Sequence, residues 1–188
     1  MAKVSMSLPT LETRRLILRP CALSDLDALH QLWTDSDVRR YLWDDIVISR
    51  QRAAQTLQEA LASAAESGVG FWAILLRDKP DVVGFCGLRY VENSCDLELL
   101  YGLAPAYWKQ GLATEASLAV LEYALVKLRL ERIYARSDIP NLMSVRVMQR
   151  LGMKFEAEAR IGTLPVHCYS ITREEFLAQR AANQPERS

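Results

Sequence analysis

The chain has 188 residues, of which 50% are hydrophobic and 24% are charged, a composition that excludes intrinsic disorder and is typical of a packed globular protein. Its 23 basic residues equal its 23 acidic residues, so no overall field attracts nucleic acid or an anionic membrane surface. This length predicts one domain over residues 1–188, with a core from about residue 11 to residue 178 and flexible termini.

The first third of the chain predicts one strand and two helices. Alternating residues at 15–19 indicate a strand that ends at a proline. Ser24 and Asp25 are suited to start a helix, and apolar residues follow at helical spacing: Leu26, Leu29, Leu32 and Trp33. A second helix is predicted from about residue 49 to residue 67, where glycines stop it. Residues 41–45 between the two helices are expected to form an aromatic and acidic connection.

The middle of the chain changes to the period of strands. Three strand-like runs cover Phe71 to Leu76, Val82 to Val91 and Asp96 to Leu103. Turn signals at residues 78–81 and 92–94 separate them. Consecutive strands joined by short turns predict an antiparallel meander.

The last part of the chain alternates helices and strands. A helix is predicted from Gly111 to Arg129, a strand from Ile133 to Ser137, and a helix from Asn141 to Leu151. A strand pair is predicted from Phe155 onward, followed after about Ala178 by a helical and then frayed tail. The order predicts an α/β fold (an α+β mixed sheet), with a largely antiparallel central sheet flanked by helices on both faces.

The stretch from Leu103 to Ala116 carries the strongest indication of a ligand. It joins the end of a strand to the start of a helix through a loop in which Gly111 and Ala113 let a ligand approach the backbone closely. The free N–H groups of the first helical turn, the helix dipole and the charge of Lys109 all favour an anion such as a pyrophosphate. The alternative is a structural loop that Gly111 caps.

Two blocks of sequence, Tyr107 to Ala116 and Asn141 to Met153, occur in an order and at a separation that resemble the GNAT superfamily of N-acetyltransferases. The resemblance extends from Leu11 to Phe176, over nearly the whole chain, and is specifically to the Rim-type branch, which includes the ribosomal-protein-alanine N-acetyltransferases. The resemblance implies the acyl-CoA N-acyltransferase fold and acetyl-CoA as the cosubstrate. It also implies cofactor contacts from Leu103, Lys109, Gln110, Gly111, Leu112, Ala113, Thr114 and Asn141.

Two positions depart from the pattern of the superfamily. Trp108 stands where its phosphate loop usually has Gln or Arg, although an aromatic residue resembles the Rim-type branch, and the backbone donors remain. The Rim-type branch usually has a pattern that resembles Glu-x-Gly-Tyr, and Leu100 stands at the position of its glycine. The bulk of the leucine side chain is expected to narrow the acceptor side of the site.

Amide formation requires a group that removes a proton from the acceptor amine, and Glu98 is the candidate, acting directly or through water. Alternation places Asp96, Glu98 and Leu100 on one face of the strand. The alternative is that Glu98 is only a charge on the surface. In that case Asp96 or a chain of water molecules is the next candidate for the base. The superfamily also implies that backbone N–H groups near residues 99–101 polarise the thioester carbonyl if a bulge opens this strand.

Ser144 and Asn141 each have two competing roles. Ser144 resembles a serine that some Rim-type enzymes use to donate a proton to the leaving thiolate, but serine is also a common helix cap. Asn141 resembles a coenzyme A contact and is equally suited to cap the helix that follows it.

The cysteines and histidines do not form a metal-binding pattern. No C-x-x-C pair occurs, and only His30 and His167 are available to complete a zinc set with the four dispersed cysteines: Cys21, Cys86, Cys95 and Cys168. His30 is expected to be structural, whereas His167 is either structural or close to the acceptor. The start of the chain lacks a signal-peptide core, and no apolar run reaches the roughly 18 residues of a membrane span. We therefore expect a cytoplasmic protein with reduced thiols and no metal.

These observations predict acetyl transfer from acetyl-CoA directly to a primary amine. A protein or peptide N-terminal amine is the first acceptor considered and a small-molecule amine the second. A catalytically silent acyl-CoA-binding module is the alternative of another class, which the presence of both Glu98 and Ser144 disfavours. No nucleic-acid or membrane partner is expected, and the chain is expected to be a monomer or a homodimer.

Overall fold

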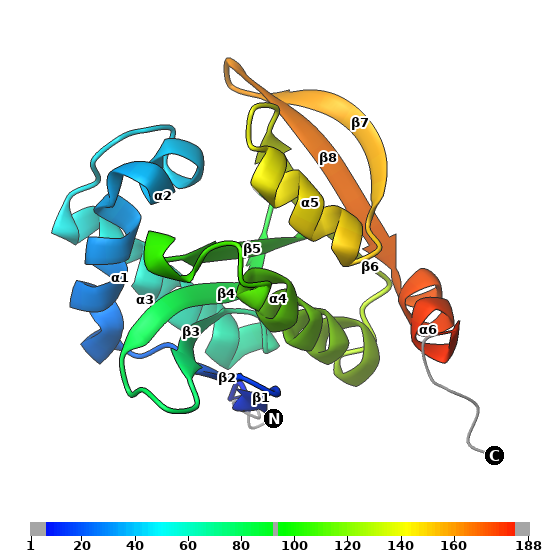
Figure 1. Cartoon of the computed structure of the whole chain (residues 1–188), viewed down its shortest axis with the longest axis horizontal. Coiled ribbons are helices and arrows are strands. Elements are labelled where there is room, and N and C mark those ends of the chain that lie inside the picture. Colours follow the sequence, from blue (N-terminus) through cyan, green and yellow to red (C-terminus); the bar gives the residue numbers. More distant parts are fainter. Residues whose placement is uncertain (1–6, 92–93, 183–188) are drawn as a thin grey trace. The chain divides into compact units, whose positions relative to one another are not determined.

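The computed structural model describes residues 7–91 and 94–182, and it contains the expected elements in the expected order, with strand β1 (Leu11–Glu12) and helix α2 (Ser36–Leu42) in addition (Figure 1). They divide into two units, Met1–Arg89 with Leu99–Val120 and Tyr90–Glu98 with Leu121–Ser188. Part of the predicted turn at 92–94 and the frayed end beyond residue 182 lie outside the described residues. Within the described ranges, no helix combines the length and the apolar character that crossing a membrane requires.

The strands of the first unit are hydrogen-bonded in chain order. They are β1 (Leu11–Glu12), β2 (Leu16–Pro20), β3 (Phe71–Leu76), β4 (Val82–Tyr90) and the second part of β5 (Leu97–Leu103). The β1–β2, β2–β3 and β3–β4 pairings are antiparallel, which confirms the predicted meander. Strand β1 was not predicted, because two residues are too few to show alternation.

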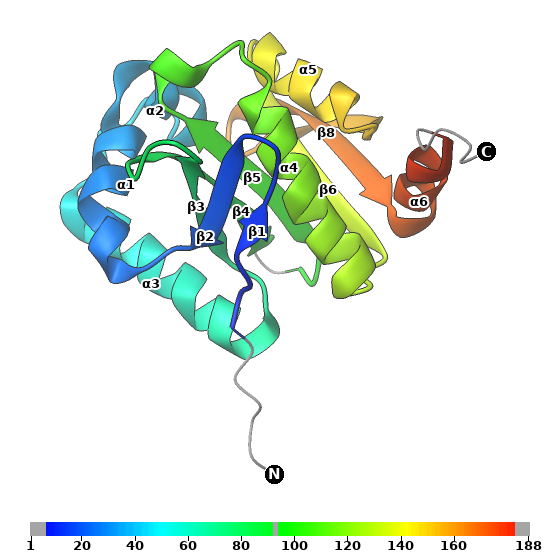
Figure 2. The same cartoon turned by 60° about the horizontal axis from the view of Figure 1, so that its bottom comes forward.

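Helices cover both faces of the sheet in the first unit (Figure 2). Helices α1 (Leu26–Thr34) and α3 (Arg50–Ser67) form one core cluster with the side chains of β3 and β4 on one face, including Phe71, Ala73 and Phe85. Helix α4 (Leu112–Glu122) lies on the other face, where Ser117 Oγ is 3.7 Å from the Sγ atom of Cys86, the neighbour of Phe85 in β4. Flanking by helices on both faces is therefore confirmed for this unit.

The predicted connection at residues 41–45 is partly wrong, because Tyr41 and Leu42 belong to helix α2 (Ser36–Leu42). The Asp35 side chain starts this helix by accepting hydrogen bonds from the N–H groups of Asp37 and Val38. Only Val38 of its seven residues is buried, so the helix has no apolar stripe from which the sequence could predict it.

The boundaries of helix α3 agree with the sequence prediction. The Ser49 hydroxyl accepts a hydrogen bond from the Arg52 N–H at 3.1 Å, and Gly68 ends the helix in the left-handed region at φ 72°. A serine cap at the start and a glycine at the end are the signals from which the helix was predicted.

The second unit contains three antiparallel neighbours in the order β6 (Arg132–Asp138), β8 (Leu164–Thr172) and β7 (Lys154–Ile161). The first part of β5 runs parallel to β6, with Glu98 opposite Tyr134. A parallel pair requires a long crossover connection, and the segment between β5 and β6 supplies it because it contains α4. The predicted mixed and largely antiparallel sheet is thus confirmed.

This unit contains the helices α5 (Leu142–Arg150) and α6 (Arg173–Ala182), and α6 follows directly on β8 (Figure 1). The helix predicted to run uniformly from residue 111 to residue 129 instead widens to a π-helical turn at Tyr123–Lys127. In this turn the Leu128 N–H donates to the Tyr123 carbonyl, five residues earlier. Apolar spacing does not distinguish this widened turn from a continuing α-helix.

A buried ion pair joins β2 to the start of the first helices. Asp25 is only 4% exposed, and both of its carboxylate oxygens accept hydrogen bonds from the Arg19 guanidinium at 2.7 Å. One of these oxygens also accepts from the Ala22 N–H at 2.8 Å. Burial alone would raise the pKa of Asp25, but the hydrogen bonds from Arg19 and Ala22 outweigh it and lower the pKa below its ordinary value.

We expect Arg19→Gln to lower the free energy of unfolding by about 2–3 kcal/mol, less than the ~3–5 kcal/mol of a fully buried pair because Arg19 is partly exposed. The stabilisation from Asp25 is present above its unfolded pKa and is lost as the pH falls through its lower folded pKa. The difference between variant and parent should therefore shrink below about pH 4 in urea unfolding at a series of pH values.

The matched control is Arg50→Gln, which removes a pair of the same kind from the surface. Arg50 Nε lies 2.8 Å from Oδ1 of Asp27, with the two side chains 60% and 80% exposed. Its loss should change stability by less than about 1 kcal/mol. An equal loss in both variants would contradict the assignment of Arg19 and Asp25 as a structural pair.

Candidate functional site

The residues predicted to bind a ligand or to react divide between the two units. The first unit holds those at the end of β5 and the start of α4: Leu103, Lys109, Gln110, Gly111, Leu112, Ala113 and Thr114. The second unit holds Glu98, Asn141 and Ser144.

The loop between β5 and α4, residues 104–111, has an uncommon backbone shape. Lys109 and Gly111 both lie in the left-handed region, at φ 60° and 76°. Glycine adopts this region readily, but a residue with a side chain does so at a cost on the order of 1 kcal/mol. Such a conformation persists only where surrounding contacts impose it.

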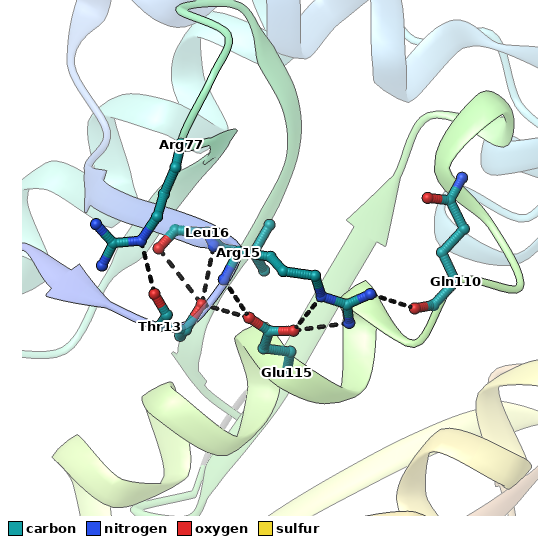
Figure 3. A network of polar contacts seen from close by, with 6 residues as sticks. All are labelled: Thr13, Arg15, Leu16, Arg77, Gln110 and Glu115. Carbon is teal, nitrogen blue, oxygen red and sulfur yellow. Dashed lines mark hydrogen bonds and ion pairs between the residues drawn. The ribbon is translucent and has the colours of Figure 1, made fainter.

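Three hydrogen bonds from side chains impose the shape of this loop. Trp108 Nε1 donates to the Leu103 carbonyl at 2.6 Å, and Gln110 Nε2 donates to the Ala106 carbonyl at 3.1 Å. Arg15 Nη1 donates to the Gln110 carbonyl at 2.9 Å (Figure 3). The Trp108 ring also packs against the core cluster of the first unit, so this aromatic residue supports the loop from inside.

The first turn of α4 presents backbone donors at the end of this loop. Its first backbone hydrogen bond runs from the Glu115 N–H to the Gly111 carbonyl at 3.0 Å. The N–H groups of Leu112, Ala113 and Thr114 precede that bond and have no partner within the helix. They lie at the positive end of the helix dipole, an arrangement that suits a phosphate or another anion.

Glu98 is buried in the second unit, with 5% of its surface exposed, so the alternative of a surface charge is wrong. Its Oε2 atom accepts a hydrogen bond from Arg136 Nη2. The predicted next candidate, Asp96, is exposed and precedes the strand. A carboxylate held in place by a guanidinium has a defined orientation, which a proton acceptor needs.

Arg136 is a site residue that the sequence did not predict. The register places Glu98 opposite Tyr134 of β6, and Arg136 opposite Cys168 of β8, so these side chains share one face of the sheet. Burial raises the pKa of the Cys168 thiol; nearby Arg136 opposes this shift and Glu98 adds to it. Alternation along β6 shows that Arg136 is on a polar face, but only the register shows that its partner is Glu98.

Asn141 occupies the helix cap that was considered for both Asn141 and Ser144. Its Oδ1 atom accepts a hydrogen bond from the Ser144 N–H at 3.1 Å, and Ser144 is the third residue of α5. The capping role of Asn141 is therefore confirmed, and the alternative in which Ser144 itself caps the helix is wrong. The bulge near residues 99–101 stays a prediction.

The two histidines have separate partners. His30 Nε2 lies 3.0 Å from the Ile48 carbonyl, a contact within the first unit that supports the expected structural role. His167 Nε2 lies 3.5 Å from Oε1 of Glu158, and its ring packs edge-on against Phe155. Across residues 7–91 and 94–182, no group of three or more His, Cys, Asp or Glu side chains is arranged to hold a metal ion.

Comparison with known proteins identifies the family. The family model described as an acetyltransferase (GNAT) domain matches residues 15–154, a range that includes Glu98, Ser144 and all the residues predicted to bind the cofactor. The chain therefore belongs to the GNAT N-acetyltransferase family. The fold expected from the resemblance is confirmed, and the chain is an enzyme of the N-acetyltransferase class.

Individual relatives differ in what is known of them. The chain is 26% identical over 174 residues to the uncharacterized N-acetyltransferase p20 of Bacillus licheniformis, covering 89% of this chain and 98% of p20. It is 23% identical over 141 residues to spermidine N(1)-acetyltransferase of Escherichia coli K12, covering 75% of this chain and 74% of that enzyme. Among solved structures, the ribosomal alpha-N-protein acetyltransferase RimL in complex with coenzyme A is similar with a TM-score of 0.74 and 17% identity, covering 87% of this chain and 98% of RimL.

Proposed function

We propose that the chain transfers the acetyl group of acetyl-CoA directly to a primary amine, and that both units belong to one N-acetyltransferase domain. The observation that carries the proposal is the first turn of α4, whose backbone donors follow a loop held in an uncommon shape. The family match supports it because residues 15–154 include parts of both units.

In this proposal the pyrophosphate of the cofactor binds the N–H groups of Leu112, Ala113 and Thr114. Lys109 is exposed and adds a full positive charge beside them. Leu103, Gln110, Gly111 and Asn141 complete the proposed cofactor contacts. The Thr114 hydroxyl is buried and has no hydrogen-bond partner in the described part of the chain, so a polar group of a ligand would satisfy it.

The chemical step requires two proton transfers. Glu98 removes a proton from the acceptor ammonium, directly or through water, and the neutral amine attacks the thioester carbonyl. The C–N bond forms, the C–S bond breaks, and the nitrogen loses its second proton as the amide forms. Ser144 donates a hydrogen bond to the departing sulfur and relays this second proton to it, so coenzyme A leaves as the thiol and the Ser144 hydroxyl is restored.

The charges around Glu98 favour a peptide N-terminus over a polyamine as the acceptor. Glu98 is paired with Arg136, and Glu156 is paired with Arg132 at 3.3 Å. A polyamine carries several positive charges and needs unpaired carboxylates, whereas a peptide N-terminus offers one amine and a series of amide dipoles. We therefore place a protein or peptide N-terminal amine first, in keeping with the Rim-type branch, and a small-molecule amine second.

Coenzyme A should raise the melting temperature of the protein, by an amount equivalent to about 2.7 kcal/mol of stabilisation at a concentration 100 times its Kd.

Gly111→Ala should weaken the binding of coenzyme A by about tenfold or more, because the φ of 76° at this position disfavours a side chain and the loop must shift. Gly162→Ala is the matched control: its φ is 59°, it lies in the turn between β7 and β8, and an added Cβ meets no atom within 4 Å. Its Kd for coenzyme A should stay within about twofold. No thermal shift in the parent protein would contradict the cofactor assignment.

Acetyl transfer can be measured by thiol release against a panel of N-terminal peptides, free amines and polyamines. We expect the peptides to react fastest and Glu98→Gln to lower turnover by about 10²–10⁴-fold at neutral pH. Turnover of the variant should partly recover at higher pH, where more of the acceptor amine is neutral.

Glu122→Gln is the control for the loss of a carboxylate that pairs with arginine, because Glu122 Oε1 lies 2.6 Å from Arg180 Nη1. Its turnover should change by less than about twofold. Coenzyme A binding without thiol release from any amine would instead support the silent acyl-CoA-binding module. Unchanged turnover in Glu98→Gln would move the base elsewhere.

Ser144→Ala should slow the single-turnover rate more than it weakens coenzyme A binding, because negative charge develops on the sulfur only as the C–S bond breaks. Its unfolding midpoint should change little, since Asn141 provides the cap of α5. Asn141→Ala is the comparison and should lose about 0.5–2 kcal/mol of stability. If Ser144→Ala moves only the midpoint, Ser144 has no role in the reaction.

A further inference from the structure

We infer that Arg15 and Glu115 are positioning residues that hold the loop of residues 104–111 in the shape that binds coenzyme A. The inference rests on the proposed function, because it concerns the same loop. Neither side chain is among the residues predicted to bind the cofactor or to react. Both belong to the first unit, although 100 positions separate them in the sequence.

The Glu115 carboxylate is the centre of a network that joins α4 to the residues before β2 (Figure 3). Its Oε1 atom accepts hydrogen bonds from Thr13 Oγ1 at 2.6 Å and from the Arg15 N–H at 2.9 Å. Its Oε2 atom accepts from Arg15 Nε and Nη2, both at 2.7 Å. Both carboxylate oxygens are thus held at two points each, which fixes the direction of the first turn of α4.

The Glu115 side chain is mostly buried, with 18% of its surface exposed. Burial alone would raise its pKa, but the hydrogen bonds from Thr13 and Arg15 outweigh it and lower the pKa below the ordinary value. The carboxylate is therefore ionised at neutral pH, and it forms a charge-assisted pair in which two nitrogens of the guanidinium share one carboxylate oxygen.

Arg15 extends this network into the loop. Its Nη1 atom donates to the Gln110 carbonyl at 2.9 Å, and Gln110 lies between the two residues of positive φ, Lys109 and Gly111. An added Cβ on Gly111 would lie 3.7 Å from Arg15 Nη2, so the guanidinium is directly beside this part of the loop. One side chain therefore connects the strained loop to the helix whose first turn binds the ligand.

Positioning and direct electrostatic attraction predict opposite results for Glu115. A carboxylate beside an anion site repels the anion, so its neutralisation by Glu115→Gln would strengthen coenzyme A binding if charge alone mattered. If Glu115 positions the loop through Arg15, the same variant weakens binding. The sign of the change in Kd decides between the two.

The experiment measures the Kd of coenzyme A by calorimetry for Arg15→Gln, Glu115→Gln and the double variant, together with KM and kcat for acetyl-CoA and the unfolding midpoint. We expect each single variant to raise Kd and KM by about tenfold, and kcat at saturating acetyl-CoA to stay within about threefold. The double variant should bind about as weakly as the weaker single variant, because the two side chains act as one unit.

Arg77→Gln is the matched control. Arg77 Nε donates to the Thr13 carbonyl and Nη2 to Glu12 Oε2, both at 2.8 Å, so it binds the same segment before β2 without a side-chain contact to Glu115 or the loop. Its Kd for coenzyme A should stay within about twofold of the parent value.

Four outcomes would overturn the inference. Unchanged or tighter binding by Glu115→Gln excludes positioning, and equal weakening by Arg77→Gln attributes the effect to a general loss of stability. If the parent binds coenzyme A and all variants bind it equally well, this inference alone is overturned. A parent protein that does not bind coenzyme A overturns the proposed function as well, so the two failures are distinguishable.

Discussion

The backbone donors at the start of α4 can bind a ligand only if no acceptor of the protein takes them. This constraint explains why the chain between β5 and α4 turns through left-handed conformations at Lys109 and Gly111 instead of continuing in a relaxed form. Two carbonyl groups of the loop, those of Ala106 and Gln110, accept hydrogen bonds from the side chains of Gln110 and Arg15, and backbone N–H groups of the loop itself bind the Ala104 and Pro105 carbonyls. These acceptors are thus bound by groups other than the N–H donors of the first helical turn. The strain is local, and the contacts that hold it come from the loop itself and from the segment before β2.

The presence of an acidic residue in the first turn of a proposed anion site has a physical reason. A carboxylate near a helix N-terminus interacts favourably with the helix dipole, by about 0.3–1 kcal/mol at an exposed position. At the same time it would compete with a phosphate. Pairing of Glu115 with Arg15 offsets its charge, so the helix gains a fixed connection to the rest of the unit with little repulsion toward an anion.

Features with local signals were predictable from the sequence, and those that depend on long-range register were not. The serine cap and terminal glycine of α3 gave its bounds, and a short apolar run followed by turn residues gave strand β3. Helix α2 was missed because it has one buried residue, and the π-helical turn after α4 was missed because its spacing resembles that of an ordinary helix.

The candidate site divides in the same way. The loop around Gly111 and the carboxylate of Glu98 were predicted, because glycine before a helix and a lone acid within an apolar strand are visible in one segment of sequence. Arg136 was not predicted, since it meets Glu98 across 38 positions through the pairing of β5 with β6. The pair of Arg15 and Glu115 was missed for the same reason, because 100 positions separate the two residues. In the sequence each of them looks like an ordinary charged residue of a protein surface.

The pairing of Glu98 with Arg136 also bears on the acceptor. A buried carboxylate without a partner is destabilising by several kcal/mol, and the hydrogen bond from Arg136 offsets part of that penalty. An incoming ammonium group then meets a pair whose charges offset each other, so a polycation gains little attraction from Glu98. In the function proposed above, recognition of the acceptor therefore depends mainly on shape and on dipoles. This is the physical reason why the proposal places a peptide N-terminus, whose amide groups provide several dipoles around a single amine, before a polyamine.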